Sequence, residues 1–244
     1  MTVGVYGLGR FGRYWAGLLA DKFERVEGCS RTPKDDLPDG VVQVSEEELL
    51  QVDALFLCVS ISSFEEVIRN IAPRLKPGMT VFDTCSVKLY PAELMKSLLP
   101  DRVSAIASHP MFGPDSGKES VKGLPMVMYP VSVDPGIFSY WKDIFLEYGM
   151  DVIEMSPDQH DHQAAYTQGV THFIGRVLQG LKLEKSAIGT VGYHKLLDIV
   201  EQTCNDPLQL FYDLQRYNPY TGEMRTAVLE SFQRTLEMLN PDKT

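Results

Sequence analysis

This sequence has no basic tract, no long apolar run and no clustered cysteines. Its 23 lysines and arginines stand against 33 acidic residues, which gives a formal net charge of −10. The absence of a Lys/Arg-rich run argues against a nucleic-acid backbone as partner. No apolar stretch reaches the roughly 20 residues of a membrane-spanning helix, and the chain starts with a strand-like segment rather than a signal peptide. We therefore expect neither nucleic acid nor a membrane as partner.

Paired cysteines are also lacking. The four cysteines, Cys29, Cys58, Cys85 and Cys204, lie far apart and form no CxxC motif. Widely spaced cysteines in a chain without a signal peptide are typical of reduced thiols in a reducing compartment. We therefore predict a cytoplasmic protein.

What the sequence does contain, at its start, is a GxGxxG motif. It consists of Gly7, Leu8, Gly9, Arg10, Phe11 and Gly12. It follows a β-rich run over residues 2–6 and opens a segment with helical periodicity, which is the context of a dinucleotide-binding turn. Such a turn brings a pyrophosphate to the backbone and to the first N–H groups of the helix. We expect all six residues to line a dinucleotide; the alternative is a structural glycine turn.

The residues after the second predicted strand, Arg25 to Cys29, bear on the choice of cofactor. NAD sites place Asp or Glu about 20 residues beyond the glycines, on the ribose 2′-hydroxyl. Here that place holds Ser30, Arg31 and Thr32, which can donate hydrogen bonds to a 2′-phosphate and pair with its charge. Glu27 comes two residues early, where it would point to the wrong side. NADP is favoured and NAD remains possible; alternatively, Arg31 is only a solvated loop charge.

Residues 1–155 alternate between strand-like and helix-like segments, which predicts an α/β fold with a mostly parallel, Rossmann-type sheet. The first helix follows the glycines, and Ser45 with Glu48 predicts a capping box for a short helix. Later helices are expected over residues 64–75, from Pro91, and from Asp134-Pro135 to Gly149. Further strands are expected over residues 53–59, 80–83, 103–107, 124–129 and 151–155.

Ligands bind outside the carboxyl ends of strands in open α/β sheets, and polar residues gather there. We expect the cofactor to be lined there by Cys58, Val59, Ser60, Ser63 and Cys85. Lys88 follows the strand over residues 80–83; it is expected either to neutralise an anionic ligand or to be plain surface.

A histidine stands at another strand end. His109 follows the expected strand 103–107 and opens a loop, residues 108–117, that two prolines and two glycines bend sharply. This places His109 where chemistry occurs in such sheets. Ser86 is placed to bond a nearby imidazole or a nicotinamide amide; its alternative role is to cap the next helix.

From residue 156 to residue 244 only helical patterns occur. Helices are expected from Ser156 toward Leu181 and over residues 190–204, 206–217 and 223–239. Their wide apolar faces exceed what so short a segment can bury alone. We therefore predict a helical second domain, 156–244, that forms a homodimer.

Taken together, these motifs resemble the prephenate/arogenate dehydrogenase family of tyrosine biosynthesis. The specific matches are DTCSVK at 83–88, SHPMFGPDSG at 108–117, His160-Asp161 followed by Gln168 and His172, and DPLQLFYDLQRYNPY at 206–220. The last stretch is most similar to the arogenate-using members.

The resemblance implies NADP-dependent oxidative decarboxylation of arogenate or prephenate, a small-molecule substrate. In that reaction a ring carbon gives a hydride to the nicotinamide, and CO2 leaves. By resemblance His109 is catalytic, and Ser86 orients it and contacts substrate and nicotinamide. Gln168, His172 and Asp206 are implied as further substrate contacts, with Asp206 favouring the ammonium of arogenate.

Several alternatives stay open. Asp206-Pro207 is also a helix N-cap pair, and His172 can be a satisfied interhelical histidine. The family's carboxylate-binding arginine has no clear equivalent; the candidates are His194, Lys195, Arg216 and Arg225.

His160 and His162 lie two residues apart, so they do not share a helix face, and we predict no metal site. The rival functions are another small NADP-dependent Rossmann dehydrogenase or imine reductase, and a non-enzymatic NADP sensor.

Overall fold

The computed structural model describes residues 1–239. The chain divides into two compact units, Met1–His160 and a second that starts at Asp161. Our predicted boundary lay between residues 155 and 156, whereas the observed division falls inside helix α6, Pro157–Ala164. The difference arises because the first turn of α6 is bound to the sheet unit, as described below.

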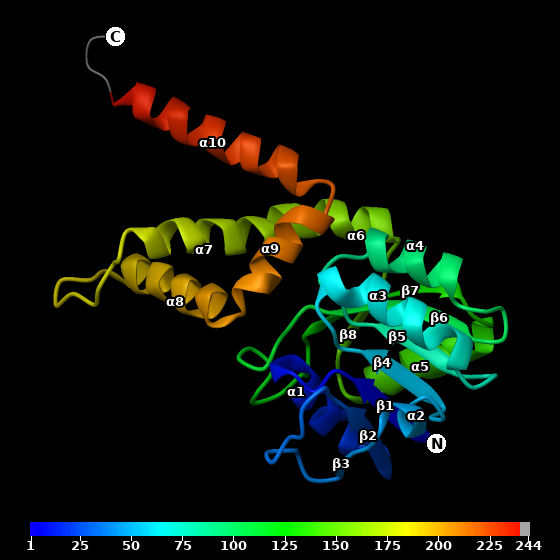
Figure 1. Ribbon diagram of the computed structural model, residues 1–244. Coiled ribbons are helices and arrows are strands. Elements are labelled where there is room, and N and C mark those ends of the chain that lie inside the picture. The colour runs from blue at the N-terminus through cyan, green and yellow to red at the C-terminus, as the bar shows by residue number, and fades with distance from the viewer. Residues whose placement is uncertain (240–244) are drawn as a thin grey trace. The chain divides into compact units, whose positions relative to one another are not determined.

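The first unit is built on one eight-stranded sheet (Figure 1). The strand order is β3-β2-β1-β4-β5-β6-β7-β8, and every neighbouring pair is parallel except β6 with β7. The predicted mostly parallel, Rossmann-type sheet is confirmed. The strands are β1 (Thr2–Tyr6), β2 (Arg25–Cys29), β3 (Val41–Gln43), β4 (Ala54–Leu57), β5 (Thr80–Asp83), β6 (Ser104–Pro110), β7 (Pro125–Ser132) and β8 (Asp151–Glu154).

Two helix starts differ from our predictions. The helices of this unit are α1 (Arg10–Ala20), α2 (Glu46–Leu49), α3 (Ile61–Ile71), α4 (Leu89–Leu98) and α5 (Pro135–Glu147). Both α3 and α4 begin earlier than their most regular apolar residues, at Ile61 and Leu89. The predicted caps are present: Ser45 forms a capping box with Glu48, and the Asp134 carboxylate accepts the N–H of Gly136 at 2.7 Å.

Aromatic side chains fill the core between the sheet and helices α1 and α5. Phe56 on β4 stacks on Phe82 of β5, with ring centroids 4.4 Å apart. Trp141 of α5 meets Phe82 edge-on at 4.8 Å, and Trp15 of α1 meets Phe56 at 5.7 Å. Large buried rings stabilise a fold strongly. They therefore hold α1, and the glycine turn before it, firmly on the sheet.

His109 lies within a strand, contrary to the expected loop. Strand β6 continues to Pro110, and His109 is in register with Val127 of the antiparallel β7. The residues Ser108 to Pro110 have weak strand propensity, so the sequence pattern stops at Ala107. Pairing with β7 extends the strand and makes the position of His109 more rigid than a loop would.

Residues 161–239 contain helices and no strand, as predicted. They comprise the rest of α6, a π-helical segment (Ala165–Gly169), α7 (Val170–Gly180), α8 (Val191–Asn205), α9 (Leu208–Tyr217) and α10 (Thr221–Met238). The expected single helix from Ser156 toward Leu181 thus carries one π turn, which often marks a functional position. Across the described residues, no helix combines the length and apolar character needed to cross a membrane.

Candidate active site

The glycine turn forms a cradle for a phosphate group. Gly7 has a φ of +103°, and a Cβ on Gly12 would lie 1.8 Å from the Gly7 carbonyl oxygen. A Cβ on Gly9 would meet nothing within 4 Å, and no side chain caps the start of α1 there. An open backbone at an uncapped helix start suits a pyrophosphate. The residues present therefore fit the dinucleotide that the motif predicts.

The other residues of the motif lie around this cradle. Leu8 is 1% exposed and packs on Gly28, so only its backbone can face a ligand. Phe11 stacks on Trp15 at 5.8 Å. Arg10 forms an ion pair with Asp115, in the loop between β6 and β7.

That loop is fastened to α1 at further points. The hydroxyl of Tyr14 donates to the Gly117 carbonyl at 3.1 Å. Phe112 is buried, with its ring edge-on to Tyr14 at 6.5 Å. The loop that follows the histidine strand therefore rests on the helix that begins at the glycine turn.

The carboxyl end of β2 lies beside the glycine turn. Gly7 donates its N–H to the Cys29 carbonyl at 3.0 Å, and Ser30 to Thr32 follow directly. The side chains of Arg31 and Thr32 are exposed. Glu27 is buried, and its carboxylate accepts from Arg25 at 2.6 Å. The predicted ribose-side residues are therefore accessible, and the nearby carboxylate is already paired.

The end of β4 contributes the other predicted cofactor residues. A Cβ on Gly7 would lie 2.5 Å from the Cys58 carbonyl, so Cys58 and Val59 are adjacent to the turn. Ser60 donates from its hydroxyl to that of Ser63 at 2.7 Å. Burial raises the pKa of the Cys58 thiol to about 12, so this thiol stays protonated. Cys58 therefore lines the turn and does not act as a nucleophile.

A buried ion pair lies where β5 ends. Lys88, 1% exposed, donates to the Asp83 carboxylate and to the Ser108 carbonyl. Burial raises the pKa of Asp83; the Lys88 ammonium and the N–H groups of Cys85 and Ser108 oppose that shift. Neither expectation for Lys88 was right, since it is neither on the surface nor available to an anionic ligand. The pair instead fixes Ser108, the neighbour of His109.

His109 is buried and neutral. It is 2% exposed, and its Nδ1 lies 2.8 Å from Nε2 of His160. Burial, then His160 and then the Lys88 charge hold the pKa of His109 well below its usual range. Ser86 is half-buried, and within residues 1–239 no hydrogen bond joins it to His109. The orienting role of Ser86 stays a prediction.

Sequence reasoning missed the role of His160, which we considered as part of the family-like His160-Asp161 pair and as a metal ligand beside His162, but not as a partner of His109. The two histidines do face apart: His160 meets His109, whereas the exposed His162 packs on the ring of Tyr220 at 5.1 Å. In the described part of the chain no three His, Cys, Asp or Glu residues form a group that could hold a metal. Only the fold reveals the pair, because 51 positions separate its members.

The helical unit carries a second polar group. Gln168, His172 and Arg176 recur every fourth residue and so share one helix face. Within residues 1–239, Gln168 Oε1, His172 Nδ1 and Arg176 Nε are buried without a hydrogen-bond partner. Buried polar atoms normally have partners, so this face points to a ligand.

Asp206 adjoins this face. Its carboxylate oxygen lies 3.9 Å from His172 Nε2, and its carbonyl accepts from Arg176 at 3.1 Å. Burial and the Arg176 charge lower the pKa of His172 to about 4. Arg176 was not among our candidate cations. Among those candidates, Arg225 is bonded to Gln215, and Arg216 lies over the ring of Tyr212.

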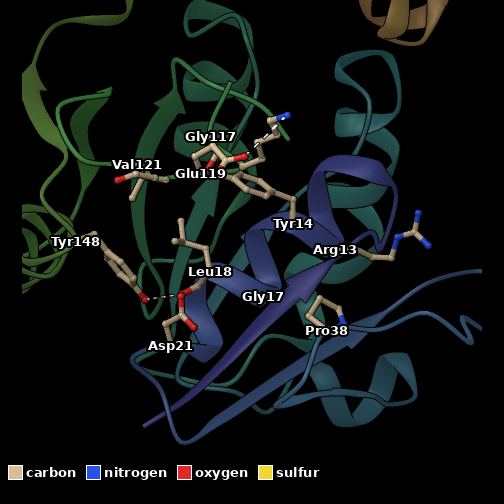
Figure 2. Close-up of a pocket in the computed structure, with 12 residues that line it drawn as sticks. Arg13, Tyr14, Gly17, Leu18, Asp21, Pro38, Gly117, Glu119, Val121 and Tyr148 are labelled. Atoms are coloured by element: carbon tan, nitrogen blue, oxygen red, sulfur yellow. Dashed lines mark hydrogen bonds and ion pairs between the residues drawn. The ribbon is translucent and has the colours of Figure 1, made fainter. Parts of the chain in front are cut away.

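A pocket of about 560 Å³ lies elsewhere on the first unit, along α1 (Figure 2). Tyr14, Gly117 and Tyr148 are part of its wall, and Tyr148 donates to the Leu18 carbonyl at 2.9 Å. None of the predicted cofactor or substrate residues lines it. It is therefore not the predicted active site.

Two protein families match the sequence. Residues 18–154 match the family described as "Prephenate dehydrogenase, nucleotide-binding domain". Residues 177–243 match "TYRAAT1-like, C-terminal domain". The first match covers more than half of the chain and bears out the nucleotide-binding domain that the glycine motif predicts.

Plant relatives are similar to this chain over nearly its whole length. Arogenate dehydrogenase 2 (chloroplastic) of Arabidopsis thaliana is 36% identical, covering 96% of this chain and 68% of the relative. Arogenate dehydrogenase 1 (chloroplastic) of the same plant is 34% identical, covering 98% of this chain and 38% of the relative. This chain thus corresponds to about two thirds of one relative and a little over a third of the other.

Solved structures share the fold. Prephenate dehydrogenase from A. aeolicus, in complex with hydroxyphenyl propionate and NAD+, superposes with a TM-score of 0.74 at 19% identity, over 98% of this chain and 89% of the other. Synechocystis arogenate dehydrogenase gives 0.68 at 21% identity, over 98% and 93%. With the family match and the identity to the plant relatives, these findings show that the chain belongs to the prephenate dehydrogenase family.

Proposed function

We propose that this chain catalyses the NADP-dependent oxidative decarboxylation of arogenate, prephenate or both, as a step of tyrosine biosynthesis. One observation carries the proposal. A buried, neutral His109 lies near the carboxyl end of β6, at the same end of the sheet as the glycine turn that follows β1. Membership of the prephenate dehydrogenase family and the two arogenate dehydrogenase relatives support it.

His109 acts on the ring hydroxyl of the substrate. Since Nδ1 is engaged by His160, Nε2 is the nitrogen left for the substrate. A neutral imidazole accepts the hydroxyl proton as the adjoining C–H bond gives up its hydride. The nicotinamide of the bound cofactor supplies the hydride acceptor. Loss of CO2 then aromatises the ring, and the proton returns to the phenol oxygen.

NADP is the cofactor that the ribose side favours. Arg31 is exposed next to the glycine turn and can pair with a 2′-phosphate, with Ser30 and Thr32 as donors. Glu27 does not compete, because its carboxylate is bound to Arg25.

Gln168, His172 and Asp206 are the proposed substrate contacts of the helical unit. The unpartnered buried atoms of Gln168 and His172 support this role. Asp206 supplies a carboxylate for the ammonium group that distinguishes arogenate from prephenate. The proposal agrees with the names of the two plant relatives.

The chain works as a homodimer through its helical unit. Helix α10 exposes Leu229, Phe232 and Leu236, which are 59%, 51% and 65% accessible. These positions share one face of the helix, and an apolar stripe of this kind is typical of an interface.

The location in the cell stays a prediction. Reduced cysteines agree with the cytoplasm, and the described cysteines are free thiols. The two plant relatives, however, are named chloroplastic.

The test is an assay with four pairings: arogenate or prephenate, each with NADP+ or NAD+, followed by the absorbance of the reduced cofactor. We expect turnover with NADP+. His109→Asn should keep NADP+ affinity and lower kcat by about 10²–10⁴, the usual contribution of a general base. Tight NADP+ binding without turnover of either substrate would favour the sensor, and a strong preference for NAD+ would overturn the role of Ser30 to Thr32.

A further inference from the structure

The catalytic histidine has a second histidine as its partner. Nδ1 of His109 and Nε2 of His160 are 2.8 Å apart, and the ring centroids are 5.1 Å apart at an angle of 64°. Both side chains are 2% exposed. At this distance one nitrogen carries the shared hydrogen and the other accepts it.

Local structure holds His160 at this place. The N–H of Met155 donates to the Met128 carbonyl of β7 at 3.2 Å, which ties the start of α6 to the sheet. Ser156 and Gln159 then bond each other reciprocally at 3.1–3.3 Å, as a capping box does. His160 follows directly, and its own N–H donates to the Ser156 carbonyl at 2.9 Å. The capped first turn therefore aims His160 at β6, next to β7.

The direction of the shared hydrogen decides whether His109 can act as a base. If His160 donated, the proton of neutral His109 would sit on Nε2, which could then accept nothing from a substrate. If His109 donates from Nδ1, its Nε2 is unprotonated and free to accept. An added proton that turns His109 into an imidazolium in the resting site is unfavourable, because the ring is buried and lies near the Lys88 ammonium.

We propose that His160 is a positioning residue: its Nε2 accepts the Nδ1–H of His109 and so fixes the His109 tautomer whose Nε2 can receive the substrate hydroxyl proton. The inference rests on the proposed function. His160 also stabilises the imidazolium that His109 becomes when that proton arrives, because the Nδ1–H bond strengthens as the ring gains charge. The proton returns to the phenol oxygen after CO2 leaves, so no net proton crosses to His160.

The tautomer is measured directly by ¹⁵N NMR of the histidine side chains in the full chain, with His109→Gln used to assign the His109 signals. We expect protonated Nδ1 and unprotonated Nε2 for His109 at neutral pH. The opposite pattern overturns the proposal. The NMR measurement needs no substrate, so it tests the tautomer even if neither arogenate nor prephenate is turned over.

Two substitutions at His160 separate positioning from mere packing. His160→Gln keeps an acceptor close to the position of Nε2, whereas His160→Met fills the space without one. We expect His160→Met to lower kcat about 10²-fold, with KM and NADP+ affinity within threefold of the parent. His160→Gln should recover at least 10-fold of that loss. His162→Gln, at an exposed position on the same helix, is the control and should leave kcat unchanged.

A purely structural role predicts another result. His160→Gln and His160→Met would then lower kcat in step with their melting temperatures, without rescue by the acceptor. Equal loss in both variants, or a kcat of His160→Met within twofold of the parent, overturns the proposal.

Discussion

Among single residues, burial fixes the charge states on which the site depends. His109 and His172 are kept neutral by burial and by nearby cations, Lys88 in one case and Arg176 in the other. Lys88 itself is held by the Asp83 carboxylate in a site closed to solvent. Each unit thus has an uncharged imidazole beside a cation, His109 with Lys88 in the first unit and His172 with Arg176 in the helical unit.

The depressed pKa of His172 makes stability depend on pH. Its pKa is about 4 in the folded chain, against an ordinary value of 6.5, so the unfolded chain takes up a proton first as the pH falls. The stability is present above pH 6.5 and is lost as the pH falls toward 4. Between pH 7 and pH 5 this residue should remove about 2 kcal/mol of unfolding free energy. Urea unfolding of the parent and of His172→Asn at both pH values measures this change. An equal change in unfolding free energy between pH 7 and pH 5 for the two proteins would contradict the assignment.

Asp206 is expected to set the choice between arogenate and prephenate. Asp206→Asn removes the charge that pairs with the arogenate ammonium, worth about 1.5–3 kcal/mol for a charge-assisted bond. The ratio of kcat/KM for prephenate to that for arogenate should therefore rise roughly 10- to 100-fold. Asp198→Asn, at an exposed position on α8, is the matched control. An unchanged ratio would remove Asp206 from the account of specificity.

Among the elements, the strand–turn–helix unit around the glycines allows cofactor binding and folding stability to be tested separately. Gly9→Ala places a methyl group where the protein has no atom within 4 Å, at a φ of −71° that alanine adopts freely. It should leave the melting temperature unchanged and weaken NADP+ binding at least 10-fold, because the methyl group enters the phosphate cradle. Gly12→Ala forces a Cβ against the Gly7 carbonyl and should lower both, at a cost of about 1–3 kcal/mol in stability. Thermal melts and fluorescence titrations distinguish the pair; parent-like NADP+ affinity in Gly9→Ala would place the phosphates elsewhere.

The elements that sequence alone predicts are those with their own local signals. Strands β1, β2 and β5 have the predicted bounds because each is a compact β-prone run ended by a turn or a polar residue. Strand β3 was missed because three residues carry no periodicity. The extension of β6 to Pro110 depends on β7, and the meeting of His109 with His160 depends on the whole sheet. Contacts of this range leave no mark in a local pattern.

At the scale of the whole molecule, the apolar stripe on α10 is the feature that a single chain leaves exposed. Phe232→Glu with Leu236→Glu would bury two charges in the proposed interface, which is strongly unfavourable. We expect the parent to be a dimer by light scattering coupled to size exclusion, and this variant to be a monomer. Gln233→Glu, exposed on the same helix, is the control and should remain a dimer. A monomeric parent, or a dimeric double variant, would contradict the interface.

The loop that rests on α1 has a consequence for how ligands influence each other. Arg10, Tyr14 and the Phe112 packing join the first turns of α1 to the segment that leaves β6. A ligand that steadies the start of α1 therefore favours the observed course of this loop, and a ligand that steadies the loop favours the helix start in return. Thermodynamic linkage makes the two effects equal. Cofactor binding and the ordering of the segment beyond His109 therefore favour each other in this fold.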